Sequence, residues 1–226
     1  MDREQLDLES ARVMFLRVSD AMVASKDLLT ELDRAIGDSD HGIGMARGFE
    51  AVRRELERPP FGSVGALLHC IGTALLRSMG GASGAVFGTL FRGGGARLHD
   101  ERALTSAALA RFLEDGLEAV QARGGARTGD KTMVDALEPA ARAARARAGE
   151  PLARALPAVA EAARLGVERT RDLVARMGKA RTLGERALGH VDPGAASVHL
   201  ILRAMAEFVS ASASEEASAG TGAGEA

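Results

Sequence analysis

The chain has 226 residues, a formal net charge of −2 and a single cysteine, Cys70. The near-neutral balance excludes the broad basic surface expected of a protein that binds nucleic acid or an anionic membrane, and one cysteine excludes an intrachain disulfide. The first residues lack the pattern of a signal peptide, and no apolar run reaches the roughly 18 residues that a membrane span needs. We therefore expect a cytoplasmic protein.

Apolar residues recur at helical spacing along most of the sequence. Aromatic residues make up only 3%, and the abundance of alanine and leucine favours closely packed helices over a β-sandwich. Glycine or proline ends most of the periodic segments, and no alternating pattern predicts a strand. The predicted helices cover approximately residues 6–33, 44–57, 62–78, 83–92, 105–122, 131–148, 151–177 and 195–209.

These eight helices with short connections predict one all-α domain over residues 1–209, built as an antiparallel bundle or barrel. Residues 210–226 contain serine, alanine, glycine and glutamate with no large apolar side chain. Such a composition cannot bury enough surface to offset the entropy of ordering, so we expect a disordered tail there.

Three aspartates lie close together after the first predicted helix: Asp33, Asp38 and Asp40, followed by His41. Hard divalent cations prefer oxygen ligands, and Mg²⁺ is usually held by a few carboxylates together with water and phosphate oxygens. Without a cation, Asp38 and Asp40 would repel each other in a tight loop. The spacing alone is compatible with a metal–phosphate site and with a solvated acidic turn.

The order of the connections places further motifs near this turn. In an antiparallel bundle alternate connections lie at the same end, so the connection at residues 37–43 shares its end with those at 80–84, 124–132 and 179–193. Glycine, charged and helix-capping residues collect in these four connections. We therefore predict that all of them meet at one pole of the bundle.

Each of these motifs has two interpretations. The Gly80-Gly81-Ala82-Ser83-Gly84 turn could cradle phosphate at a helix N-terminus, or Gly80 could end one helix and Ser83 cap the next. In the Gly129-Asp130-Lys131-Thr132-Met133 motif, Lys131 could lie near phosphate, or Asp130 could be a helix cap.

The last connection offers a similar choice. Asp192-Pro193-Gly194 is a capping pattern with aspartate at the N-cap and proline at the first helical position, and it could also present Asp192 to a ligand. Lys179 and Arg181 are the best basic candidates for nucleotide phosphates, and a charged turn is the alternative.

Taken together, four motifs resemble the L subunit, the nucleotide-binding part, of dihydroxyacetone kinases. They are Asp33-x4-Asp38-x-Asp40-His41-Gly42, Gly80-Gly81-Ala82-Ser83-Gly84, Gly129-Asp130-Lys131-Thr132-Met133 and the stretch 184–195, and the likeness covers residues 5–209 in order. The resemblance implies an eight-helix antiparallel barrel whose loops at one end hold ADP or ATP through two Mg²⁺ ions. By position, Asp33, Asp38 and Asp40 would bind the metal. The residues implied around the nucleotide are His41, Gly42, Ile43, Gly44, Ala82, Ser83, Gly124, Met133, Lys179, Asp192, Pro193 and Gly194.

The same resemblance implies a kinase subunit of glycerol metabolism that passes a phosphoryl group to dihydroxyacetone on a separate K subunit. The phosphoryl donor in such systems is either ATP or a phosphotransferase-system protein, and no residue here decides between them. We expect a homodimer or a hetero-oligomer. Three alternatives stay open: a nucleotide-responsive regulatory module, an L-type subunit acting on another small ketose or polyol, and a degenerate barrel with no nucleotide site.

Three positions depart from the family pattern. Ser39 stands where glycine is usual, and Gly44 where asparagine is common. Lys179 stands where arginine is usual, so the charge is kept while the bidentate fork is lost. We predict a stiffer acidic turn and an altered nucleotide affinity.

Overall fold

The computed structural model describes residues 4–58 and 60–220, with side chains described as far as residue 211. Helices make up most of this part of the chain, and its two strands have three residues each, which confirms the predicted all-α class. The elements are β1 (Gln5–Asp7), α1 (Leu8–Ala24), α2 (Lys26–Ile36), α3 (His41–Leu56), α4 (Val64–Ser78), α5 (Gly81–Gly95), β2 (Ala103–Thr105), α6 (Ser106–Gly124), α7 (Val134–Ala146), α8 (Leu152–Arg169), η1 (Thr170–Asp172), η2 (Lys179–Ala187) and α9 (Pro193–Gly220), where η marks a 3₁₀ helix.

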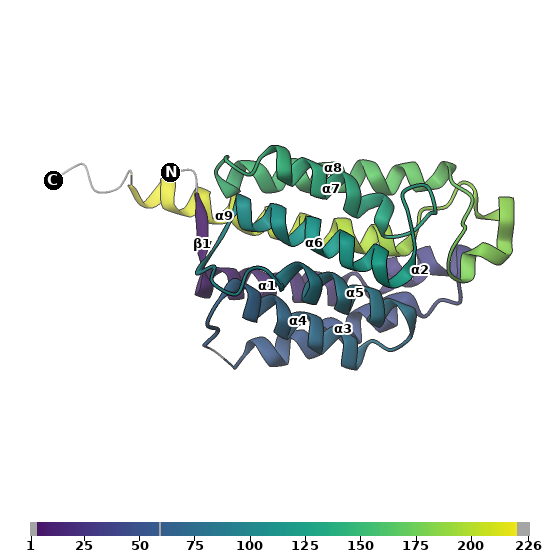
Figure 1. Ribbon diagram of the computed structural model, residues 1–226, viewed down its shortest axis with the longest axis horizontal. Helices are drawn as coiled ribbons and strands as arrows, with labels where there is room; N and C mark the ends of the chain where they lie inside the picture. The colour runs from purple at the N-terminus through teal and green to yellow at the C-terminus, as the bar shows by residue number, and fades with distance from the viewer. Residues whose placement is uncertain (1–3, 59, 221–226) are drawn as a thin grey trace.

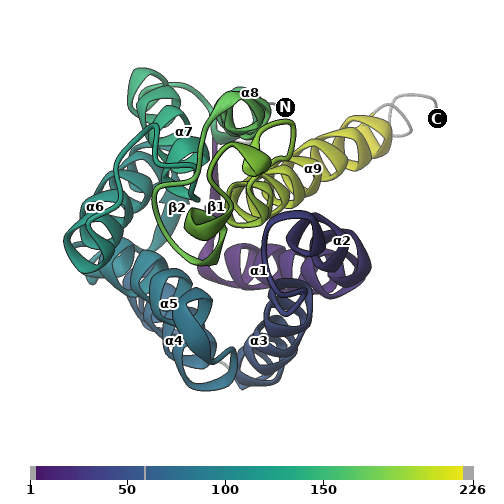
Figure 2. The same cartoon turned by 90° about the vertical axis from the view of Figure 1, so that its right-hand side faces the viewer.

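Eight of the described α-helices form a closed ring (Figure 2). Helices α1, α3, α4, α5, α6, α7, α8 and α9 each pack on the next, and α9 packs back on α1. The interior contains Phe15, Phe91 and Phe112, with Phe91 in edge contact with Phe15 at 6.1 Å between ring centroids and tilted against Phe112 at 5.4 Å. Each such buried ring contributes roughly 1.5–3 kcal/mol through removal from water.

Short polar side chains fix where several helices begin. Asp7 accepts a hydrogen bond from the Ser10 N–H at the start of α1, and Thr105 caps α6 in the same way through the Ala108 N–H. Because these caps satisfy N–H groups that lack a partner within the helix, they set the helix starts and hence the lengths of the connections.

The first predicted helix is two helices. Ser25 ends α1 by donating its hydroxyl to the Ala21 carbonyl, and α2 then turns outward, packing mainly on α3 rather than taking a place in the ring. Helix α2 buries Leu29, Asp33 and Ile36 and leaves Leu28 about half exposed.

The glycine run at residues 93–95 does not break its helix as predicted, since α5 continues to Gly95. A Cβ on Gly93 would lie 2.4 Å from the Ala119 Cβ, and one on Gly94 would lie 2.3 Å from the Phe112 carbonyl oxygen. These glycines therefore allow α6 to approach α5 closely.

A small antiparallel sheet closes the pole opposite the predicted site (Figure 1). β1 pairs with β2, with Leu6 opposite Leu104 and both side chains buried. Strands of three residues are too short to show an alternating pattern, which explains why the sequence did not predict them. Helix α9 continues past the expected domain end at residue 209 to Gly220, and residues 221–226 of the expected tail lie outside the described residues.

Within the described ranges, none of the helices has both the length and the apolar character that crossing a membrane requires.

Candidate nucleotide and metal site

The acidic turn joins the end of α2 to the start of α3. Asp33 is buried in the last turns of α2, whereas Asp38 and Asp40 are exposed on the loop that follows. One carboxylate oxygen from each of the three lies within 4.8 Å of the others. Three carboxylate oxygens this close together offer the type of ligand that a hard divalent cation prefers.

Asp33 also holds the turn in shape. Its Oδ2 accepts hydrogen bonds from the backbone N–H groups of Asp40 at 2.9 Å and His41 at 3.1 Å. Gly37 makes room for the same carboxyl group, because a Cβ there would lie 2.0 Å from Asp33 Oδ1. The first aspartate therefore sets the position of the other two.

Ser39 adopts a left-handed backbone conformation at the tip of the turn, with φ of +64°. A residue with a Cβ is strained there, whereas glycine is not, which explains why glycine would be the expected residue. We expect Ser39→Gly to raise the free energy of unfolding by about 0.5 kcal/mol, because the relieved strain exceeds the extra unfolded-state entropy of glycine. Urea denaturation measures this change. Ser39→Ala is the matched control and should bring no gain, and a Ser39→Gly protein less stable than Ser39→Ala would contradict the expectation.

Lys179, at the start of η2, lies over the acidic turn. Its ammonium group forms ion pairs with Asp38 and, at 3.2 Å, with Asp40. The hydrogen bond from Lys179 lowers the pKa of Asp38, and the same contact raises the pKa of Lys179. The lysine therefore supplies to these two carboxylates the positive charge that a bound cation would supply.

His41 begins α3 and joins it to α5 and α9. Its Nε2 lies 2.8 Å from the Ser197 hydroxyl and its Nδ1 lies 3.2 Å from the Ser83 hydroxyl. Ser197 donates its only hydroxyl hydrogen to the Pro193 carbonyl, so it accepts from Nε2–H. Nδ1 is then the acceptor, and the Ser83 hydroxyl donates to it. Burial lowers the pKa of His41, which keeps the ring neutral.

The start of α5 faces the acidic turn and differs from the capping interpretation of its motif. Met79 ends α4, Gly80 precedes α5, and Ser83 lies within the first turn of α5 instead of capping it. The first N–H groups of a helix have no partner within the helix and carry the positive end of its dipole. Arg47, on α3, fixes this turn from outside by donating to the carbonyl oxygens of Ser78 and Met79.

The connection after α6 and the start of α9 form the opposite wall. Asp130 does not cap α7 as one interpretation predicted, since its carboxylate accepts from the Arg127 N–H. Asp192 caps α9 as its motif predicted, accepting from the Ala195 N–H at 2.7 Å. Burial raises the pKa of Asp192 to about 7.

The four connections at residues 37–43, 80–84, 124–132 and 179–193 all border one cavity of about 680 Å³. The arrangement predicted from the order of the connections is therefore what the structure contains. The predicted site residues that line the cavity are Asp33, Asp38, Asp40, His41, Ile43, Gly44, Ala82, Ser83, Gly124, Met133, Lys179, Asp192, Pro193 and Gly194.

Gly42 does not line this cavity. A Cβ at Gly42 would lie 2.1 Å from the Lys26 carbonyl oxygen and 2.4 Å from the Thr30 hydroxyl. The residue therefore permits close packing of α3 on α2.

Several residues of the cavity were not predicted. Val86, Phe87, Val120 and Met177 form an apolar part of the wall. Lys131, which one interpretation of its motif placed near phosphate, also lines the cavity, from the loop before α7. The apolar side chains have the helical spacing of ordinary core residues, so the sequence contained no signal that distinguishes them.

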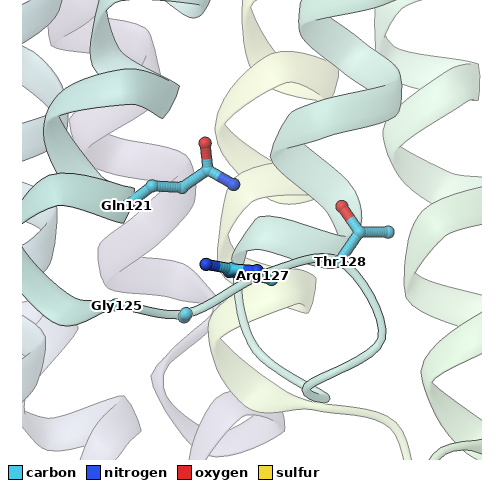
Figure 3. A pocket seen from close by; sticks show the side chains of 5 residues that line it. Gln121, Gly125, Arg127 and Thr128 are labelled. Atoms are coloured by element: carbon cyan, nitrogen blue, oxygen red, sulfur yellow. The ribbon is translucent and has the colours of Figure 1, made fainter.

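A second hollow of about 480 Å³ lies beside the connection after α6 (Figure 3). Gln121, Gly125, Ala126, Arg127 and Thr128 line it, and Ala126 also borders the main cavity. This hollow has no carboxylate in its lining, so the acidic chemistry belongs to the main cavity.

Residues 35–207 match the family model described as the DAK2 domain. The chain belongs to the DAK2 domain family. It is 38% identical over 192 residues to the ADP-binding subunit of the PEP-dependent dihydroxyacetone kinase of Escherichia coli, covering 84% of this chain and 91% of that subunit. This DAK2 chain is also 34% identical over 206 residues to a D-erythrulose kinase of Mycolicibacterium smegmatis, covering 89% of this chain and 36% of that protein.

The DAK2 fold is also present in a solved structure. The dihydroxyacetone kinase from C. freundii in complex with AMP-PNP and Mg²⁺ superposes on this chain with a TM-score of 0.68 and 30% sequence identity, covering 87% of this chain and 33% of that one. The family membership predicted from the four motifs is thus confirmed.

Proposed function

We propose that this chain is the nucleotide-binding subunit of a dihydroxyacetone kinase and passes a phosphoryl group to dihydroxyacetone held on a separate K subunit. The observation that supports this most is the cluster formed by Asp33, Asp38 and Asp40, which lines the same cavity as the start of α5. The chain that carries this cluster is similar to an ADP-binding kinase subunit, and the alignment covers 91% of that subunit.

The residues of the cavity fit Mg²⁺ and a nucleotide. Asp33, Asp38 and Asp40 offer oxygen ligands for one or two ions, and Mg²⁺ bound there neutralises the charge that develops on a phosphoryl group in transfer. The free N–H groups at the start of α5 suit phosphate oxygens. Lys179 adds a movable positive charge from the other side of the acidic turn.

The apolar part of the cavity suits the base of the nucleotide. Val86, Phe87, Val120 and Met177 offer flat and flexible apolar surfaces on which a heteroaromatic ring can lie. The Ser83 hydroxyl is already engaged as a donor to His41, so its backbone N–H is the group available to phosphate. His41 is thus a positioning residue for Ser83 and α9.

Asp33, Asp38 and Asp40 belong to the proposed metal site, and the Asp192 carboxylate caps α9, so we assign none of the cavity carboxylates to the deprotonation of a sugar hydroxyl. His41 is the histidine of the cavity lining, and both of its ring nitrogens are bonded to serine hydroxyls. The acceptor and its base therefore belong to another protein or domain. This supports a hetero-oligomer with a K subunit.

We further propose that the phosphoryl group arrives through a PEP-dependent relay onto retained ADP, since the Escherichia coli relative carries that description. The acceptor has a second candidate, a four-carbon ketose, because a relative of 34% identity is a D-erythrulose kinase. The K subunit would hold the acceptor and would therefore determine which ketose is phosphorylated.

Turnover assays on the purified chain test the proposal. Alone, the chain is expected to phosphorylate neither dihydroxyacetone nor erythrulose, because the proposal places the acceptor site on the K subunit. Addition of a K subunit, with a PEP-driven phosphoryl donor or with ATP, should give turnover, and ADP that survives dialysis would identify the relay. Phosphorylation of either ketose by the chain alone would refute the division between subunits, and absence of Mg·ADP binding in calorimetry would refute the nucleotide site itself.

A further inference from the structure

The connection between α8 and α9 extends over the cavity, and its two ends lie close together. We call residues 173–188 the cover segment. Met177, Gly178, Lys179 and Ala180 of this segment line the cavity. Figure 2 shows the segment crossing the open end of the ring.

The ends of the cover segment are joined directly to each other. The Gly189 N–H donates to the Arg171 carbonyl at 2.8 Å, and Arg171 Nη1 donates to the Gly189 carbonyl at 3.1 Å. The Asp192 N–H donates to the Thr170 hydroxyl at 2.9 Å. These bonds form a neck from which the segment extends.

Lys131 connects both sides of this neck. Its Nζ donates to the Thr170 carbonyl at 2.5 Å and to the His190 carbonyl. The lysine comes from the loop before α7, far from both partners in the sequence, and it is only 2% exposed. A buried ammonium is costly unless its donors are satisfied, and removal of this group takes a charged donor from the buried Thr170 carbonyl and from the part-buried bond to His190.

The backbone at Lys131 is also held in an unusual conformation, with φ of +60°. A non-glycine residue persists in this region where the surrounding structure holds it. The neighbouring Asp130 carbonyl accepts from the Arg176 N–H inside the cover segment at 3.1 Å. The loop therefore touches the segment through both a side chain and its main chain.

We propose that Lys131 is a positioning residue that clamps the neck of the cover segment and thereby sets Lys179 over the acidic turn. Only the expected effect of Lys131 on nucleotide binding rests on the proposed function. The clamp itself is a property of the free protein, since the described bonds of Lys131 are to main-chain carbonyls.

Limited trypsin digestion of the full chain tests the clamp directly. Lys131→Met should accelerate cleavage after Arg176, Lys179, Arg181 and Arg186 by about tenfold or more, because cleavage follows the opening equilibrium of the segment. Lys26→Met, which removes an exposed lysine on α2, is the matched control and should leave these rates unchanged. Lys131→Arg, which keeps the donors, should restore slow cleavage at least in part.

A folded Lys131→Met protein whose cover segment is cleaved at the original rate would overturn the proposal. So would faster cleavage spread evenly over the chain, because that indicates a general loss of stability. If Lys131→Met does not fold, Lys131→Gln replaces it, with the same expectation and the same overturning results.

Calorimetry with Mg·ADP then measures the link to the site. Lys131→Met should weaken binding about tenfold, and this loss should shrink in a Lys179→Met background if Lys131 acts through Lys179. Equal losses in both backgrounds would overturn the positioning role. If the unaltered chain does not bind Mg·ADP, the proposed function fails while the digestion result still decides whether the clamp exists.

Discussion

Asp38→Asn combined with Asp40→Asn is expected to weaken binding of Mg·ADP by about 100-fold or more. The double variant leaves Asp33 as the only carboxylate of the cluster, and direct ligands contribute at least as much as the outer-shell partners whose loss costs roughly 10–100-fold. Both side chains are exposed on a loop, and their removal relieves the repulsion between them. The helical fold should therefore stay intact, and calorimetric titration with Mg·ADP measures the loss.

Asp100→Asn is the control for this experiment. Asp100 is an exposed aspartate on the connection between α5 and α6, away from the cavity, and its replacement changes the net charge in the same direction. It should leave Mg·ADP binding unchanged. Retention of tight, Mg²⁺-dependent binding by the Asp38→Asn, Asp40→Asn protein would contradict the assignment of the metal site to the acidic turn.

Lys179→Met is expected to change two affinities in opposite directions. In the free protein Lys179 is paired with Asp38 and Asp40, so a cation that arrives alone must displace the ammonium group. Without the lysine, Mg²⁺ alone should bind more tightly, by about tenfold. Mg·ADP should bind about tenfold more weakly, because the phosphates lose a positive partner.

Two neighbouring variants separate this effect from a general change in charge. Lys179→Arg keeps the charge and should bind Mg²⁺ alone as the original protein does. Arg181 was the other basic candidate for phosphate, but the structure leaves it out of the cavity lining. Arg181→Met therefore removes a charge two residues away on the same segment and should change neither affinity by more than a small factor. If Lys179→Met weakens Mg²⁺ and Mg·ADP alike, Lys179 does not compete with the cation.

The sequence predicted the site better than it predicted the shape of its cover. The prediction that four connections meet at one pole needed only a correct count of the helices between them. The break at Ser25 did not disturb this prediction, because α1 and α2 together take the place of one predicted helix. The left-handed Ser39 agrees with the position where glycine is usual. The aspartate spacing was informative because a tight turn brings nearby carboxylates together whatever the rest of the fold does.

Other features could not be predicted because they depend on contacts between distant segments. Lys131 is buried because the two ends of the cover segment come together around its ammonium group. The sequence near Lys131 gives no sign of this contact between distant segments. The glycines at 93–95 ended the predicted helix because glycine is usually a helix breaker, whereas here close packing against α6 and, for Gly95, against α4 decides. Helix α8 likewise ends at Arg169, before the predicted end near Met177, without a glycine or proline to mark the place.

Helix α2 stands outside the ring, yet it contributes to both functional parts of this pole. Asp33 in its last turns holds the acidic turn, and Ile36 packs with Ala175 and Ala187 of the cover segment in a small apolar cluster separate from the main core. A displacement of α2 would therefore disturb the carboxylates and release the cover in a single event. We therefore expect occupancy of the acidic turn to change how firmly the cover segment is held, with α2 as the element that contacts both.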